Sequence, residues 1–129
     1  MSYQDYNPER RAQQFTDLKV WQDAHDFVLA IYKFTRNFPD EERYGLTSQV
    51  RRAAVSIAAN IVEGFKRKGR PDKLRMYNIA QASLEECRYF LILSVDLNYG
   101  DADALKQQSR KLARRLASYI KSVEDDKNK

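Results

Sequence analysis

The chain has 129 residues, of which 43% are hydrophobic and 32% are charged, so it can form one domain with a single core and a charged surface. Its 4 Gly and 3 Pro argue against an all-β chain with many tight turns, and its 1 Cys and 1 His exclude a disulfide framework and argue against a metal cage. The 23 Lys and Arg outnumber the 18 Asp and Glu, which gives a formal net charge of +5.

The first residues carry no signal-peptide pattern, and no apolar run approaches the roughly 20 residues of a membrane helix. We therefore expect a cytoplasmic protein without a membrane partner. Residues 1–16 are polar with scattered aromatic side chains and no helical period, which predicts an N-terminal arm that is disordered alone or docked on a neighbour. A bundle domain is expected over 17–126, and 127–129 form a polar C-terminal tail.

Two helices are predicted in the first half of the chain, because core-type residues recur at spacings of three and four. The first is expected over 18–37 and ends before Pro39. The second is expected over 44–66, and a break at 69–72 follows it. The positions expected to face the core are Val20, Ala24, Phe27, Ile31, Phe34 and Phe38 in the first helix, and Leu46, Val50, Ala53, Ile57, Asn60 and Gly64 in the second.

Two further helices are predicted over 72–97 and 102–124, separated by a break at 98–101. Their expected core positions are Tyr77, Ala80, Leu84, Cys87, Leu91 and Val95, and then Leu105, Ser109, Leu112, Leu116, Tyr119 and Val123. No segment shows the alternation that is typical of a strand. Four helices of similar length with short connections predict an all-α fold, an up-down-up-down antiparallel four-helix bundle.

Polar and small residues interrupt the second and third helices at core positions. A buried Asn60 would fix the register of the bundle, because its amide must be satisfied. Gly64 costs about 1 kcal/mol relative to Ala inside a helix, so either a close backbone approach or the end of the helix explains it. The third helix presents the small residues Ala80, Ala82 and Ser83. These features predict that the second and third helices pack closely.

If these two helices are antiparallel and the chain turns near Gly69, the numbers of two residues that face each other across the helices add up to about 138. In this register, Ser56 lies opposite Ala82 or Ser83, and Asn60 lies opposite Asn78. It also brings Arg52 toward Glu86. We expect a polar network that specifies the bundle and consists of Arg52, Ser56, Asn60, Glu63, Ser83 and Glu86.

A basic cluster lies between the second and third helices. Its six cations are accompanied by one acid, Asp72, so residues 66–75 carry the equivalent of the whole net charge. Cations in an array bind phosphates, and flanking aromatic residues such as Phe65 and Tyr77 can stack on unpaired bases. The alternative is a solvated loop that keeps the protein soluble. The candidate nucleic-acid-binding residues are Lys66, Arg67, Lys68, Arg70, Lys73 and Arg75, with a secondary patch of Arg110, Lys111, Arg114 and Arg115.

No residue pattern predicts catalysis. His25 has no nucleophile or orienting acid at a suitable spacing, and Cys87 lies among core positions. Glu85 and Glu86 are adjacent, so they point about 100° apart on a helix and do not form an acid–base pair. No phosphate-binding loop, nucleophile elbow or zinc motif occurs. We expect a protein that is not an enzyme and that holds no cofactor and no metal.

Several spaced motifs resemble one family. They are LKVWQDAH at residues 18–25, FPDEE at 38–42, GLTSQVRRAAVSIAANIVEG at 45–64 and NIAQASLEE at 78–86. Together they resemble the 23S rRNA intervening-sequence protein family over roughly residues 15–123. Two mild departures are Val62 and Ala82, where the family pattern commonly has Ala and Gly.

The resemblance implies an antiparallel four-helix protomer and a homopentameric ring. A related branch comprises the accessory proteins of diversity-generating retroelements, which are basic pentameric barrels that bind nucleic acid and a reverse transcriptase. The family name records where some of its genes lie, inside inserts in ribosomal RNA genes, and does not assign a function.

Two functions are therefore open. The first is a non-catalytic oligomer that binds RNA or DNA through backbone phosphates without reading sequence. The second is a protein-interaction scaffold whose ring recruits a partner such as a reverse transcriptase or another polymerase. A ring would repeat the basic cluster about five times, and that repetition favours binding through summed potential and avidity.

Overall fold

The computed structural model describes residues 6–126 and contains no strand within them. Its four long helices are α1 (Lys19–Thr35), α2 (Leu46–Lys66), α3 (Arg70–Asp96) and α4 (Asp103–Glu124). Three short 3₁₀ helices are η2 (Pro8–Arg10), η3 (Phe15–Asp17) and η4 (Asp40–Glu42). The all-α prediction is confirmed, and every predicted end of a long helix lies within two residues of the observed one. The expected tail, 127–129, lies outside the described residues.

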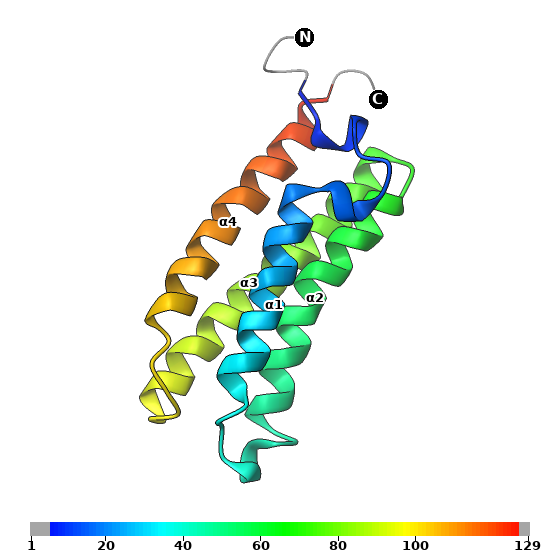
Figure 1. The fold of residues 1–129 in the computed structure, drawn as a ribbon. Helices are drawn as coiled ribbons and strands as arrows, with labels where there is room; N and C mark the ends of the chain where they lie inside the picture. The colour runs from blue at the N-terminus through cyan, green and yellow to red at the C-terminus, as the bar shows by residue number, and fades with distance from the viewer. Residues whose placement is uncertain (1–5, 127–129) are drawn as a thin grey trace.

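The helices form an antiparallel bundle (Figure 1). Helices α1, α2, α3 and α4 each pack against the next in the chain, and α4 closes the bundle against α1. The N-terminal and C-terminal segments and the α2–α3 turn lie at one end, which we call the terminal end. The α1–α2 and α3–α4 connections lie at the opposite end. The up-down-up-down prediction therefore agrees with the path of the chain.

The core contains nearly all of the positions expected from the sequence. Phe27, Ile31, Ile57 and Leu116 are completely buried, and each side chain of this size stabilises the fold by about 1.5–3 kcal/mol when it leaves water. Phe34 and Val95 are half-buried at the margin of the core. Asn60 is also half-buried, so the prediction that it is largely buried is wrong.

Helices α2 and α3 meet in the predicted register. The hydroxyls of Ser56 and Ser83 lie 2.8 Å apart and share a hydrogen bond. Gly64 is buried because the ring of Tyr77 lies against it: a Cβ atom on Gly64 would be 2.2 Å from Cε1 of Tyr77. The predicted close backbone approach is therefore confirmed, two residues before α2 ends at Lys66.

The expected pairing of Arg52 with Glu86 does not form. Both side chains are exposed, and no ion pair within the described residues joins them. Water solvates both charges, so the register alone does not bring them together. Asn60 donates to the backbone oxygen of Ser56 at 2.8 Å and to its hydroxyl at 3.0 Å, and Glu63 pairs with Arg67 at 3.2 Å. The polar network is thus confined to the Ser56–Asn60–Ser83 group.

The described part of the N-terminal arm packs on the bundle of its own chain. Glu9 accepts hydrogen bonds from the hydroxyls of Tyr77 and Tyr119 and forms an ion pair with Lys73 at 3.1 Å. Asn7 donates to Asp126 at 2.8 Å. For residues 6–16, the prediction of an arm that is disordered alone or docked on a neighbour is therefore wrong, because these residues pack on their own bundle. Residues 1–5 lie outside the described part of the chain.

Candidate nucleic-acid interface

The six cations of residues 66–75 lie at the terminal end of the bundle, but they differ in exposure. Lys66, Lys68 and Arg75 are exposed, and Arg67 is half-buried. Arg67 pairs with Glu63 and Asp72, and Asp72 also pairs with Arg75 at 3.1 Å. These exposed ion pairs are weak, so the arginines can exchange their carboxylate partners for phosphates.

Two of the six cations serve the fold. Lys73 is only 7% exposed, and its ammonium donates to the backbone oxygens of Gly64 at 3.1 Å and Phe65 at 2.9 Å in addition to its ion pair with Glu9. Arg70 donates to the backbone oxygen of Asp126 and joins the start of α3 to the end of α4. Lys73 is therefore buried, and the prediction that it belongs to the exposed cationic cluster is wrong.

A sequence signal for the burial of Lys73 existed. Lys73 lies four residues before Tyr77, so it continues the row of core positions of α3 toward the helix start. Tyr77 is itself completely buried and Phe65 is half-buried, so Tyr77 offers no free ring face for a base. The turn can bind phosphates, but the expected stacking on Tyr77 is wrong.

The secondary patch lies on α4. Arg110, Lys111 and Arg114 are exposed, and none of them forms an ion pair within the part of the chain that the structure describes. Arg115 is paired with Asp23 of α1. Asp23, Lys111, Arg114 and Arg115 line a shallow hollow of about 280 Å³.

A larger cationic groove, of about 810 Å³, was not anticipated from the sequence. It lies at the end opposite to the terminal end, between the last turn of α1, the α1–α2 connection and the first half of α2. Four arginines line it: Arg36, Arg43, Arg51 and Arg52. They are scattered over 17 positions of the sequence among the acids of η4, so a count of charge along the chain does not reveal them.

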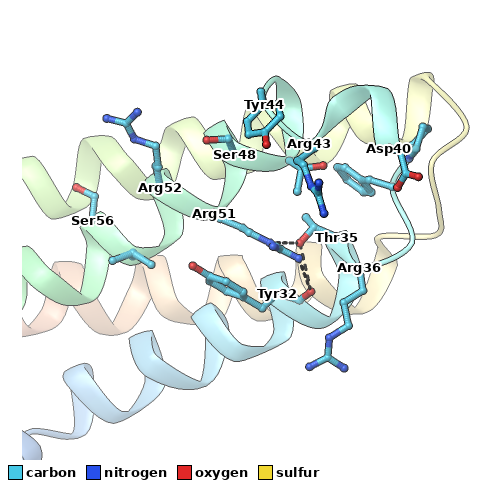
Figure 2. Close-up of a pocket in the computed structure, with 14 residues that line it drawn as sticks. Tyr32, Thr35, Arg36, Asp40, Arg43, Tyr44, Ser48, Arg51, Arg52 and Ser56 are labelled. Carbon is cyan, nitrogen blue, oxygen red and sulfur yellow. Dashed lines mark hydrogen bonds between the residues drawn. The ribbon is translucent and has the colours of Figure 1, made fainter.

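Arg51 crosses the groove from α2 to α1 (Figure 2). Its Nε donates to the hydroxyl of Thr35 at 2.8 Å and Nη2 lies 3.4 Å from the backbone oxygen of Tyr32, while its guanidinium lies 4.6 Å from the centre of the Tyr32 ring. These partners are neutral, so the charge of Arg51 is not compensated. Figure 2 shows Arg36 and Arg52 extending outward from the rim.

The remaining candidates for chemistry have structural environments. The ring of His25 stacks on Trp21 at a centroid distance of 5.0 Å and is exposed. Burial raises the pKa of the Cys87 thiol to about 12, with a further contribution from the charge of Glu86, so the thiol stays protonated at neutral pH. Within residues 6–126, no three His, Cys, Asp or Glu side chains are grouped as metal ligands. None of the described helices is long and apolar enough to span a membrane.

The fold and its surfaces define a class, the antiparallel four-helix bundles with cationic patches at both ends. The family model described as 23S rRNA-intervening sequence protein matches residues 16–122, and the chain belongs to this family. The resemblance found in the sequence motifs is thereby confirmed. The relation to the retroelement accessory proteins stays a prediction.

Several solved structures are similar to this chain, and one of them matches it with a TM-score of 0.70 and 27% sequence identity. It is a protein with unknown function from the S23 ribosomal protein family of Bacteroides thetaiotaomicron, and the match covers 78% of this chain and 97% of that one. No curated protein is similar enough to this chain to count as a relative.

Proposed function

We propose that this protein is a non-catalytic, oligomeric bundle that binds the phosphate backbone of RNA or DNA without reading sequence. The observation that carries the proposal is the set of exposed cations on α4 that have no carboxylate partner within the described residues: Arg110, Lys111 and Arg114. The exposed cations of the α2–α3 turn add to them: Lys66, Lys68 and Arg75, with Arg67 beside them.

The character of these surfaces supports binding without sequence readout. Lysines and arginines on exposed helix faces neutralise phosphates but do not distinguish bases. Contacts to phosphates fix the position of a protein on a nucleic acid and carry no sequence information directly. Lys73 and Arg70 are excluded from the binding residues because they hold the fold together.

Oligomerisation is part of the proposal, with a pentamer as the expected state. Three apolar side chains of α3 are exposed: Ile79, Tyr89 and Ile92. A monomer would leave this apolar surface in water, whereas an assembly would bury part of it. The family resemblance supplies the number five.

The test is a fluorescence anisotropy titration of a single-stranded RNA and a DNA duplex at two salt concentrations. The triple variant Lys66→Ala, Arg67→Ala, Lys68→Ala and the triple variant Arg110→Ala, Lys111→Ala, Arg114→Ala should each bind all sequences more weakly. Their salt slopes should be flatter by about 0.7 per lost contact on single strands and about 0.9 on duplex. The control variant Lys19→Ala, Lys33→Ala, Lys106→Ala removes the same charge from scattered positions and should bind nearly as well as the wild type. Unchanged binding in both surface variants would contradict the proposal.

A second candidate function is a scaffold that recruits a protein such as a reverse transcriptase or another polymerase. The exposed Ile79, Tyr89 and Ile92 of α3 favour it, because apolar contacts hold protein partners together at high salt. A partner that stays bound in native lysate after nuclease treatment and at high salt, together with no binding of nucleic acid at low salt, would select the scaffold.

A further inference from the structure

The groove between α1 and α2 concentrates positive charge in a concave surface. Four arginines line it against one acid, Asp40, which Figure 2 shows on the α1–α2 connection. Arg36, Arg43 and Arg52 form no ion pair within the described residues, and Arg51 is bonded only to neutral groups. In contrast, Arg67 and Arg75 at the α2–α3 turn are paired with carboxylates. Within the described residues, the arginines of the groove therefore lack the carboxylate partners that Arg67 and Arg75 have.

The neighbouring Glu42 does not compensate the charge of these arginines. Glu42 directs its two carboxylate oxygens to the backbone N–H of Leu46 at 3.0 Å and to the hydroxyl of Tyr99 at 2.7 Å. These two bonds lower the pKa of Glu42, so it stays ionised while it caps α2 and ties the two connections at this end together. It is not among the residues that line the groove.

The backbone adds to the attraction for an anion. Thr47 and Ser48, in the first turn of α2, line the groove, so the positive end of the α2 dipole faces it. The C-terminal end of α1 carries the negative end of its dipole. Arg51 compensates this negative charge, because its guanidinium lies within reach of the backbone oxygen of Tyr32. Guanidinium forks, hydroxyls and a helix start together are the groups that bind phosphate oxygens.

An aromatic ring lies at the same site. Tyr44 lines the groove and is 90% exposed, so its ring faces water instead of the core. A ring held beside phosphate-binding groups can stack on a base. The groove volume of about 810 Å³ is within the range of small-molecule sites and is large enough for one nucleotide.

From these observations we propose that the groove between α1 and α2 binds a nucleotide, with its phosphate at the arginines and its base on Tyr44. The nucleotide is either free or an unpaired unit of a strand, since both present the same chemistry. The inference uses residues of the opposite end of the bundle from the α2–α3 turn, so it does not depend on that turn binding nucleic acid.

The experiment is calorimetric titration of the full-length protein with adenosine 5′-monophosphate, adenosine and inorganic phosphate. The variant Arg43→Gln, Arg52→Gln removes two exposed guanidiniums that have no partner in the fold. It should bind the monophosphate at least about tenfold more weakly. The control Lys19→Gln, Lys33→Gln removes two exposed cations of α1 that do not line the groove, and it should keep the wild-type affinity. Tyr44→Ala should weaken the monophosphate and leave inorganic phosphate unchanged.

A second arm identifies the source of the nucleotide. A 5′-phosphorylated oligo-dA of about six nucleotides, within the usual span of a single-strand site, is titrated into the same variants. If the wild type binds only this strand, and Arg43→Gln, Arg52→Gln weakens it, the groove binds a nucleotide of a strand. If Arg43→Gln, Arg52→Gln weakens neither the monophosphate nor the strand, and the strand is weakened only by the Lys66, Arg67 and Lys68 substitutions, the inference is overturned while the proposed function stands. Equal affinity for inorganic phosphate and the monophosphate, or equal loss in the groove variant and its α1 control, also overturns it.

Discussion

At Gly64 the missing side chain allows an aromatic ring to lie against the backbone of α2. Tyr77 is completely buried, and its hydroxyl is held by Glu9 and lies 3.1 Å from the hydroxyl of Tyr119. The ring therefore cannot turn away from an added methyl group without losing these partners. The helix-propensity cost of glycine is offset by the close packing that it permits.

Gly64→Ala should therefore destabilise the protein, although alanine is the better helix former by about 1 kcal/mol. Its Cβ would lie 2.2 Å and 2.7 Å from two ring carbons of Tyr77, and overpacking of this kind costs about 1–3 kcal/mol after relaxation. Urea unfolding of the variant checks the sign. Gly69→Ala is the control, because its Cβ would meet only a Pro71 atom at 3.9 Å. A Gly64→Ala protein as stable as the wild type would show that the ring moves freely.

Because of Tyr77 and Tyr119, the stability of the fold should fall at alkaline pH. Burial and the neighbouring Glu9 raise the pKa of both phenols well above the ordinary value of 10.0. They stay neutral in the folded chain while the unfolded chain ionises, so stability is fully present below pH 10 and falls as the pH rises above it. Each tyrosine contributes a slope of up to about 1.4 kcal/mol per pH unit.

Tyr119→Phe should accordingly be destabilising at neutral pH by about 1.5–3 kcal/mol, because the hydrogen bond to the Glu9 carboxylate and the contact with the Tyr77 hydroxyl are lost. Above pH 10 its stability should fall less steeply than that of the wild type. Denaturation midpoints measured from neutral to strongly alkaline pH check both effects. Tyr44→Phe changes a fully solvated phenol and should leave the profile as it is. Parallel profiles for Tyr119→Phe and the wild type would contradict this assignment.

Among the elements, the N-terminal arm is the one that owes its position to distant partners. Glu9 contacts Tyr77 and Tyr119, which lie 68 and 110 positions away in the chain. The side chains of Glu9 and Lys73 are each only 8% exposed, so this ion pair is largely removed from water. A carboxylate in such a place holds the arm, α3 and α4 together.

Glu9→Gln should release the arm and destabilise the bundle by about 3–5 kcal/mol, because Lys73 is left buried without its counter-ion. We expect a lower unfolding midpoint and faster tryptic cleavage after Arg11, which is exposed in the arm. Glu41→Gln, at the opposite end, removes an exposed acid and serves as the control. An unchanged cleavage rate in Glu9→Gln would mean that the other contacts of the arm suffice.

The helices themselves could be predicted from the sequence because their signals are local. Spacings of three and four show which face of each helix is buried. The antiparallel register then predicts that Ser56 lies opposite Ser83, as the structure shows. The arm could not be positioned in this way, since nothing near Glu9 in the chain indicates its partners. Lys73 was misplaced because a run of cations suggests exposure, whereas its position on the core face of α3 decides its burial.

The candidate sites divide in the same way. The α4 patch could be found because its cations are neighbours in the sequence and share an exposed helix face. The groove could not, because its arginines come from α1, α2 and the connection between them, and the acids of η4 cancel their charge in a sequential count. Only the fold separates Glu42, turned toward Leu46 and Tyr99, from the arginines of the groove.

At the scale of the whole molecule, cations lie at both ends of the bundle and on α4, while α3 carries exposed apolar side chains among its charged ones. Charged patches repel like patches on other copies, whereas burial of the apolar side chains of α3 lowers the free energy. The surfaces therefore suit an assembly in which α3 is covered and the cationic surfaces stay open to a polyanion. Repetition of those surfaces would raise the avidity for a strand.

The assembly itself is the last prediction. Five copies of the 15.1 kDa chain would give a particle of about 75 kDa in sedimentation equilibrium. Ile92 is 51% exposed on α3, and Ile92→Glu should shift the particle toward the monomer, because a carboxylate in an apolar contact would be desolvated without a partner. The helical content should not change, since the residue is outside the core. Gln107→Glu introduces the same charge on the exposed surface of α4 and should leave the mass unchanged. A wild-type mass equal to that of one chain at micromolar concentration would refute the assembly, and with it the contribution of avidity to binding.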